Sequence, residues 1–396
     1  MKKLAADFLF TDEGIVQNQV LILDDTAKVL AIELLDQHDP GSVEYHAGLL
    51  VPGLVNAHCH LELSHMKGKV ATGTRLIPFI TNVVKFRDVP EQEVLAAITA
   101  ADQEMFEAGI VAVGDICNRL DTAVCKAQSP IRYYSFVEMF DFLQDAAAEK
   151  TVQDYLPIYE QQAQHDGNRR SAVPHAPYSV SKSLFARINQ LNQGKGSVSI
   201  HNQETPPENE LFVSKTGDFV AFYRDFGISL EEFSATGQSA IHYALAHMDP
   251  ACRTLFVHNT TTTAADIAAA QQWGQNGIYW VSCPNANLYI ENRLPNYQLF
   301  LDANAKVALG TDSLTSNWQL SILEEMKTIQ RYQSYVPFAE ILKWATSNGA
   351  EALQYEQELG SFSVGKRPGV NLITGLAGKQ VDELRLQAES TIRRLV

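Results

Sequence analysis

The chain has 396 residues, of which 45% are hydrophobic and 19% charged, a composition typical of a globular protein with a large core. Its formal net charge of −15 argues against a nucleic-acid-binding surface, which needs clustered Lys and Arg. The sequence has no apolar run of about 18 residues and no signal-peptide pattern, which predicts a cytoplasmic protein without a membrane span.

The predicted elements change in character along the chain. Residues 1–50 consist of short apolar runs separated by polar turns, which predicts β-strands at ADFLF, NQVLILDD and AKVLAIELL. From Leu49, apolar runs alternate with helical stretches such as VLAAITAADQEMFEAG and ADIAAAQQWG, whose apolar residues follow i, i+3, i+4 spacing. The eight strand candidates in this part are LLVPGLVNAH, IVAVGDIC, IRYYSFVE, SAVPHA, SVSIHN, RTLFVHN, IYWVSC and KVALGTD.

This alternation predicts an α/β fold with a (β/α)8 TIM barrel at residues 51–355. A doubly wound sheet is the alternative, but it normally has a Gly-rich phosphate turn after its first strand, and here that strand ends in His-Cys-His. After Gly360, β-like runs return at GSFSVG, GVNLITGL and STIRRLV. We therefore expect both chain ends, residues 1–50 and 356–396, to form a small β-sandwich domain.

Histidines and carboxylates follow the predicted strands at their C-terminal ends, where barrel enzymes place their active sites. His58 and His60 end the first strand. Because residues i and i+2 of an extended segment point to the same side, both imidazoles could bind one metal, although a His-x-His pair also occurs by chance. The further candidates at strand ends are His201, with Glu204 three residues later, His258 and Asp312.

Each of these residues also has a plain structural explanation. A single histidine is more often a core or surface residue than a ligand, and Asp312 could cap a helix that begins near Asn317. Their shared position at strand ends nevertheless favours one site. Three histidines and one carboxylate suit a single Zn(II), or Fe(II), which lowers the pKa of a water molecule toward neutrality. Glu204, close in sequence to His201, is placed to move the water proton to the leaving group.

At these residues the chain resembles the amidohydrolase superfamily, in its cytosine-deaminase-like and chlorohydrolase-like branch. The resemblance extends over nearly the whole chain through PGLVNAHCHLELS, HAPYSVS, HNQET, VHN, CPNANLYI and LGTDSLTSN, in that order. It implies Glu204 as the proton shuttle, His258 as a hydrogen-bonding partner of the attacking water or reacting group, and His175 as a substrate-side residue. No lysine ends a bridging fourth strand, so one metal is expected rather than two. The implied metal ligands are His58, His60, His201 and Asp312.

Within this branch, PGLVNAHCHLELSHMKG and LIPFITNVVKFR most resemble the aminodeoxyfutalosine deaminases of menaquinone biosynthesis. The resemblance implies hydrolytic release of ammonia from 6-amino-6-deoxyfutalosine or an adenosine-like nucleoside. A nucleoside also needs partners for its ribose hydroxyls, and His175, Glu62 and Arg87 are the polar candidates that loops could bring near it. Sister enzymes act on S-adenosylhomocysteine and methylthioadenosine.

Other functions remain as alternatives at this point. They are hydrolysis of another C–N or C–Cl bond, as in guanine, cytosine or triazine hydrolases, and a non-catalytic scaffold, against which the complete set of candidate ligands argues. The expected partner is a small-molecule substrate, without nucleic acid or membrane, and the chain could form a homodimer.

Overall fold

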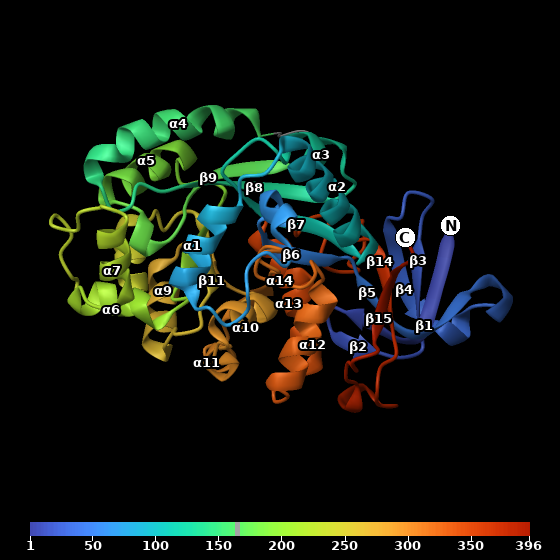
Figure 1. The fold of residues 1–396 in the computed structure, drawn as a ribbon. Helices are drawn as coiled ribbons and strands as arrows, with labels where there is room; N and C mark the ends of the chain where they lie inside the picture. The colour runs from blue at the N-terminus through green and yellow to red at the C-terminus, as the bar shows by residue number, and fades with distance from the viewer. Residues whose placement is uncertain (163–166) are drawn as a thin grey trace.

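Eight parallel strands lie at the centre of the molecule in two four-stranded sheets (Figure 1). The computed structural model describes residues 1–162 and 167–396. In each sheet, neighbouring strands are consecutive in the chain and pair in parallel. The first sheet contains β6 (Leu54–Cys59), β7 (Ile110–Cys117), β8 (Arg132–Met139) and β9 (Arg169–Pro174), and the second contains β10 (Ser197–Asn202), β11 (Arg253–His258), β12 (Ile278–Ser282) and β13 (Lys306–Leu309).

The two sheets contact each other along both edges. At one edge, an isolated parallel bridge joins Cys59 to Asp312, and the backbone N–H of Thr311 donates to the carbonyl of His58 at 3.0 Å. At the other edge, the backbone N–H of His201 donates to the carbonyl of His175 at 2.9 Å. The C-terminal ends of all the strands therefore lie on the same side of the molecule.

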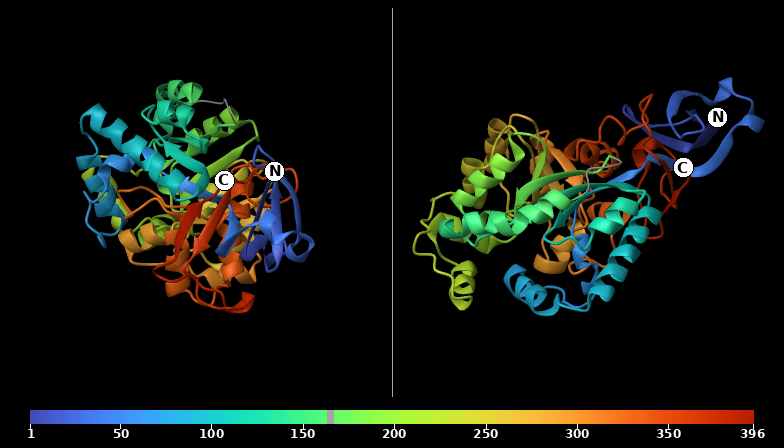
Figure 2. Two further views of the ribbon diagram at one scale, coloured as in Figure 1. Left: turned by 90° about the vertical axis from the view of Figure 1, so that its right-hand side faces the viewer. Right: turned by 90° about the horizontal axis from the view of Figure 1, so that it is seen from above.

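Helices connect these strands and cover their outer faces (Figures 1 and 2). The helices predicted at VLAAITAADQEMFEAG and ADIAAAQQWG are confirmed as α2 (Glu91–Glu107) and α9 (Ala264–Trp273). Since both faces of the sheets are covered, every residue of β6, β7, β10 and β12 is buried. The remaining α-helices are α1 (Leu76–Phe86), α3 (Ala123–Gln128), α4 (Ala148–Gln161), α5 (Lys182–Asn192), α6 (Pro206–Ser214), α7 (Asp218–Asp225), α8 (Ala240–His247), α10 (Pro284–Glu291), α11 (Tyr297–Asp302), α12 (Ile322–Tyr332), α13 (Phe338–Ala345) and α14 (Ser347–Ala352).

The two chain ends meet in one seven-stranded sheet to one side of the helices (Figure 2). Its order is β15-β14-β5-β1-β3-β4, with β2 paired to β1. It is a single hydrogen-bonded sheet, whereas the expected sandwich has two facing sheets, and the run GSFSVG forms no strand. Its strands are β1 (Lys2–Thr11), β2 (Gly14–Val16), β3 (Gln19–Leu23), β4 (Val29–Leu34), β5 (Glu44–Pro52), β14 (Val370–Thr374) and β15 (Thr391–Arg394).

One predicted strand, LLVPGLVNAH, is two strands in the structure, because β5 ends at Pro52 and β6 begins at Leu54. The residue between them, Gly53, is enclosed so tightly that an added Cβ would lie 2.2 Å from the Val111 side chain and 2.4 Å from the Pro368 carbonyl oxygen. The chain passes there from the seven-stranded sheet into the parallel strands. Among residues 1–162 and 167–396, no helix combines the length and the apolar character needed to cross a membrane.

Candidate metal centre and pocket

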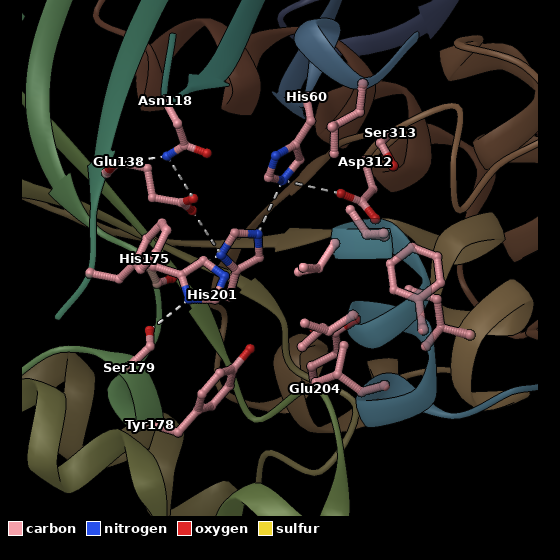
Figure 3. A pocket seen from close by; sticks show the side chains of 18 of the residues that line it. His60, Asn118, Glu138, His175, Tyr178, Ser179, His201, Glu204, Asp312 and Ser313 are labelled. Atoms are coloured by element: carbon pink, nitrogen blue, oxygen red, sulfur yellow. Dashed lines mark hydrogen bonds and ion pairs between the residues drawn. The ribbon is translucent and has the colours of Figure 1, made fainter. Parts of the chain in front are cut away.

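Four side chains converge at the C-terminal ends of the parallel strands, and Figure 3 shows three of them, His60, His201 and Asp312. His58 belongs to β6, His60 directly follows it, His201 belongs to β10, and Asp312 follows β13. The Nε2 atoms of His60 and His201 are 3.2 Å apart, and Asp312 Oδ1 lies 3.3 Å from His60 Nε2 and 3.6 Å from His58 Nε2. One potential ligand atom from each of the four lies within 4.8 Å of all the others, so the group could hold a metal ion.

The donor set fits a divalent metal of the zinc type. Both ring nitrogens of fully buried His58 are without a hydrogen-bond partner in the described part of the chain. A buried polar atom without a partner costs free energy, and a metal at the cluster would satisfy one of these nitrogens. His201 donates from Nδ1 to the His175 carbonyl at 2.8 Å, which leaves its Nε2 directed at the cluster. Such a carbonyl commonly fixes the tautomer of a metal-binding histidine.

Asp312 is held at the cluster by its backbone. Its N–H donates to the His58 carbonyl at 3.1 Å, and its φ of 57° lies in the left-handed region, which is strained for a residue with a side chain. Its carboxylate accepts a hydrogen bond from Ser316 Oγ. The alternative in which Asp312 caps a helix near Asn317 is wrong, because α12 begins at Ile322 and Ser321 caps it.

Glu204 and His258 lie beside this cluster. Glu204 Oε2 is 3.7 Å from His258 Nε2, and His258 Nδ1 lies 2.9 Å from Asn287 Oδ1. Glu208 holds the loop in place, since its two carboxylate oxygens accept the backbone N–H groups of Gln203, at 2.9 Å, and Glu204, at 3.0 Å. Both Glu204 and His258 are nearly inaccessible to solvent and line the same pocket as three members of the cluster, His60, His201 and Asp312.

Burial and neighbouring charges together raise the pKa of Glu204 but lower the pKa values of Asp312 and His60. Burial raises the pKa of Glu204 well above its usual range, and the nearby carboxylates of Asp312 and Glu291 raise it further. Burial would also raise the pKa of Asp312, but the imidazoles of His58 and His60 outweigh it and hold that pKa below its usual value. Burial lowers the pKa of His60 to about 3, which favours the neutral ring that a metal requires.

The pocket in front of the cluster encloses about 220 Å³. The three residues predicted to bind substrate, His175, Glu62 and Arg87, all line it. Arg87 Nη2 is 3.5 Å from Glu62 Oε1, and His175 Nδ1 is 2.6 Å from Ser179 Oγ. The outer part of the pocket is an apolar wall. Helix α1 contributes Leu76, Phe79, Ile80, Val83 and Val84, α7 contributes Phe222, and Phe226 directly follows α7.

Among the polar residues of this pocket that the sequence analysis missed are Glu138 and Asn118. Glu138 is the next-to-last residue of β8, and Asn118 directly follows β7. Asn118 Nδ2 donates to the Glu138 carbonyl at 2.9 Å and lies 3.3 Å from Glu138 Oε2 (Figure 3). Both occupy the strand-end position that identified the histidines, so the same signal was present for them.

Comparison with known proteins agrees with the resemblance found in the motifs. A family model described as "Amidohydrolase family" matches residues 49–386. The aminodeoxyfutalosine deaminase of a Nitratiruptor species is 26% identical over 382 residues, which are 92% of this chain and 89% of that protein. The adenosine deaminase of Helicobacter pylori is 26% identical over 334 residues, 83% of this chain and 79% of that protein.

Solved structures of similar proteins have the same fold. The structure of Helicobacter pylori aminofutalosine deaminase in complex with methylthio-coformycin has a TM-score of 0.81 at 22% identity and covers 96% of this chain and 94% of that chain. An adenosine deaminase from Xanthomonas campestris with bound zinc has a TM-score of 0.73 at 21% identity, with 94% and 84% covered. At these identities the structural likeness shows the fold alone.

Proposed function

Because the chain belongs to the amidohydrolase family, we propose that it is a metal-dependent deaminase that releases ammonia from an aminopurine nucleoside, 6-amino-6-deoxyfutalosine or an adenosine-like compound. The observation that carries this proposal is the four-residue cluster, with the Glu204 carboxyl and the His258 ring beside it in one pocket. A non-catalytic scaffold would have no need to bury this set of unpaired ligand atoms.

We assign His58, His60, His201 and Asp312 as the ligands of one divalent metal, zinc with iron as the alternative. When bound, the metal supplies a water molecule activated for attack at neutral pH. The zinc-type donor set of three imidazoles and one carboxylate supports this assignment. The zinc bound to the Xanthomonas campestris adenosine deaminase is consistent with it.

Glu204 is the proposed proton carrier of the reaction. Deamination at C6 of a purine requires a group that takes the proton of the attacking water and gives it to the departing amine. Burial raises the pKa of Glu204, which makes its carboxyl a better proton acceptor than an exposed one. His258, with Nδ1 against Asn287 Oδ1, keeps Nε2 directed toward Glu204 for a hydrogen bond to the water or the reacting group.

The pocket supports a nucleoside better than a free base. Its inner end has polar groups and its outer part has the apolar wall of α1 and α7, so a substrate that fills it needs a part beyond the base. Relatives of this chain include aminodeoxyfutalosine, adenosine and 5-methylthioadenosine/S-adenosylhomocysteine deaminases. Guanine, cytosine or chlorotriazine hydrolysis is the second candidate, and no feature of the pocket specifically favours it.

We also propose an organisation for the whole chain. The backbone bonds across both edges of the two four-stranded sheets support a closed (β/α)8 barrel over residues 51–355. Residues 1–50 and 356–396 then form a separate β domain, consistent with the pairing of β5 and β14. We propose a cytoplasmic location for the protein.

The test is ammonia release by the zinc-loaded protein. We expect kcat/KM for 6-amino-6-deoxyfutalosine, adenosine or S-adenosylhomocysteine to exceed that for guanine, cytosine and chlorotriazines. A free base preferred by about tenfold, equivalent to 1.4 kcal/mol, contradicts the nucleoside assignment and leaves the deaminase mechanism intact. Absence of ammonia release from every substrate contradicts both.

A further inference from the structure

One residue that lines the pocket, Glu138, has a buried carboxylate oxygen without a hydrogen-bond partner in the described part of the chain. Glu138 is 3% exposed and lines the pocket next to His201 (Figure 3). Its Oε2 has Asn118 Nδ2 at 3.3 Å, but its buried Oε1 has no hydrogen-bond partner among residues 1–162 and 167–396. Leaving such an oxygen unpaired is costly, so the pocket requires a donor that these residues do not supply.

Glu138 does not serve as the orienting partner of His201. Its Oε1 is 3.4 Å from His201 Nδ1, but that nitrogen already donates to the His175 carbonyl at the shorter distance of 2.8 Å. The backbone therefore fixes the His201 ring, and Glu138 Oε1 is left without a hydrogen-bond partner among the described residues. Although Glu138, His175 and His201 could be grouped as metal ligands, a cation there would have to displace the same hydrogen bond.

His175 provides a second polar group next to Glu138. The potential ligand atoms of the two residues lie within 4.8 Å of each other. Ser179 Oγ occupies His175 Nδ1 at 2.6 Å, so the other nitrogen of the ring is the one left for a ligand in the pocket. Two adjacent hydroxyl groups match this pair, because one donates to the carboxylate while the other can donate to or accept from either tautomer of the imidazole.

The other carboxylate on this side of the pocket is already paired. Glu62 Oε2 accepts the backbone N–H groups of Asn118, at 2.9 Å, and Arg119, at 3.2 Å, and its Oε1 faces Arg87. The guanidinium of Arg87 can only donate hydrogen bonds, so it cannot accept one from a hydroxyl. Glu138 is the carboxylate of this wall that keeps a free oxygen, as far as the structure describes the chain.

We propose that Glu138, with His175 beside it, binds the 2′,3′-diol of a ribonucleoside and determines a preference for ribose over deoxyribose. This inference rests on the proposed nucleoside deaminase function. The position of Glu138 suits the sugar, because it lies at the Nδ1 edge of His201, whereas the Nε2 edge faces the metal cluster and the reacting carbon. The ring of His201 thus separates the sugar end from the base end of the pocket.

The experiment compares kcat/KM for adenosine, 2′-deoxyadenosine and 3′-deoxyadenosine in the zinc-loaded protein and in Glu138→Leu and Glu138→Gln. We expect the unchanged protein to prefer adenosine by about 10- to 100-fold, the effect of leaving a buried acceptor unpaired. Glu138→Leu should reduce this ratio to within about threefold at unchanged zinc content, since no acceptor remains to be left unpaired. Glu138→Gln keeps one carbonyl acceptor and should retain part of the preference.

Glu325→Gln is the matched control. Glu325 is fully buried, and burial raises its pKa to about 8, as it does for Glu138. Its two oxygens accept from the Asn285 backbone and Asn317 Nδ2, both at 2.8 Å, and it does not line the pocket. Its variant should therefore keep the adenosine to deoxyadenosine ratio, whatever its effect on stability.

Three results would overturn the inference about Glu138. They are equal rates for adenosine and both deoxyadenosines in the unchanged protein, an undiminished preference in Glu138→Leu, and loss of zinc in Glu138→Leu, which would make the residue a positioning group for His201. If no nucleoside is deaminated, the proposed function has failed, and calorimetric binding of adenosine and 2′-deoxyadenosine decides about the diol. Equal or absent binding then refutes it as well.

Discussion

Replacing Lys126 by Met would test a buried ion pair that lies next to the candidate metal centre. Lys126 Nζ lies 2.5 Å from Asp115 Oδ2, with exposures of 2% and 0% for the two side chains. The other carboxylate oxygen of Asp115 accepts the backbone N–H of Leu61 at 2.8 Å, directly after His60. The pair therefore connects α3 and β7 to the turn that carries a proposed metal ligand.

The charge left behind determines the size of the effect. Burial lowers the pKa of Lys126, but the Asp115 carboxylate more than compensates and keeps that pKa above its usual value. In Lys126→Met, the buried Asp115 has no countercharge, and removing one partner of a buried pair costs about 3–5 kcal/mol. Because the total stability of a domain is about 5–15 kcal/mol, this substitution should remove a large part of it. The double variant Lys126→Met/Asp115→Asn leaves no buried charge and should lose less than the single variant.

The assay is urea unfolding followed by fluorescence of the four tryptophans. Lys306→Met is the control, because its ion pair with Glu351 is half exposed and such pairs contribute about 0–1 kcal/mol. If Lys126→Met lowers the free energy of unfolding by less than about 1 kcal/mol, the reasoning is refuted, because an exposed ion pair contributes up to that amount. A double variant that is less stable than the single variant would refute it too.

Three further predictions concern the metal and the proton carrier. Elemental analysis should find one zinc or iron per chain, and two metals would contradict the single-metal assignment; removing the metal with a chelator should abolish turnover and lower Tm, and zinc should restore both. His58→Ala should lose bound metal, and a variant that retains full metal content would show that His58 is not a ligand. Glu204→Gln should keep metal and fold but lose turnover by about 10²–10⁴-fold. A near-normal rate in that variant would exclude the proton-carrier role, whereas loss of metal would identify Glu204 as a ligand.

The parallel strands were predictable because their signal is local. Each is a short apolar run next to a helical pattern, and burial on both faces of a parallel sheet requires that composition. The run GSFSVG has a similar alternation but forms no strand, although Phe362 within it is 2% exposed. The hydroxyls of Ser361 and Ser363 lie 2.7 Å apart and contact each other in a loop instead. The other apolar residue of the run, Val364, is 72% exposed, so the alternation in this run predicts neither a strand nor a consistently buried face.

The candidate ligands were predictable for the same local reason, but the environment of the pocket was not. The positions of His58, His60 and His201 at strand ends follow from the chain order of the strands. The pairing of Glu62 with Arg87, and the lack of a partner at Glu138 Oε1, depend on which side chains turn toward each other in space. The strand-end position marks Glu138 as a candidate in the sequence, but no spacing in the sequence shows that one of its oxygens lacks a partner.

The backbone conformation at the strand ends could not be predicted from the sequence. Gln203, His258 and Asp312 have φ values of 47°, 77° and 57°, and a left-handed residue with a side chain costs about 1–3 kcal/mol. Glycine would adopt these angles without strain but would provide no imidazole or carboxylate. Hydrogen bonds to a helix and to a strand offset the strain, since the Gln203 N–H donates to Glu208 of α6 and the Asp312 N–H donates to the carbonyl of His58 in β6. Local propensity opposes these conformations, and contacts with the following helix and with the neighbouring strand support them, so the geometry of the site depends on the folded chain.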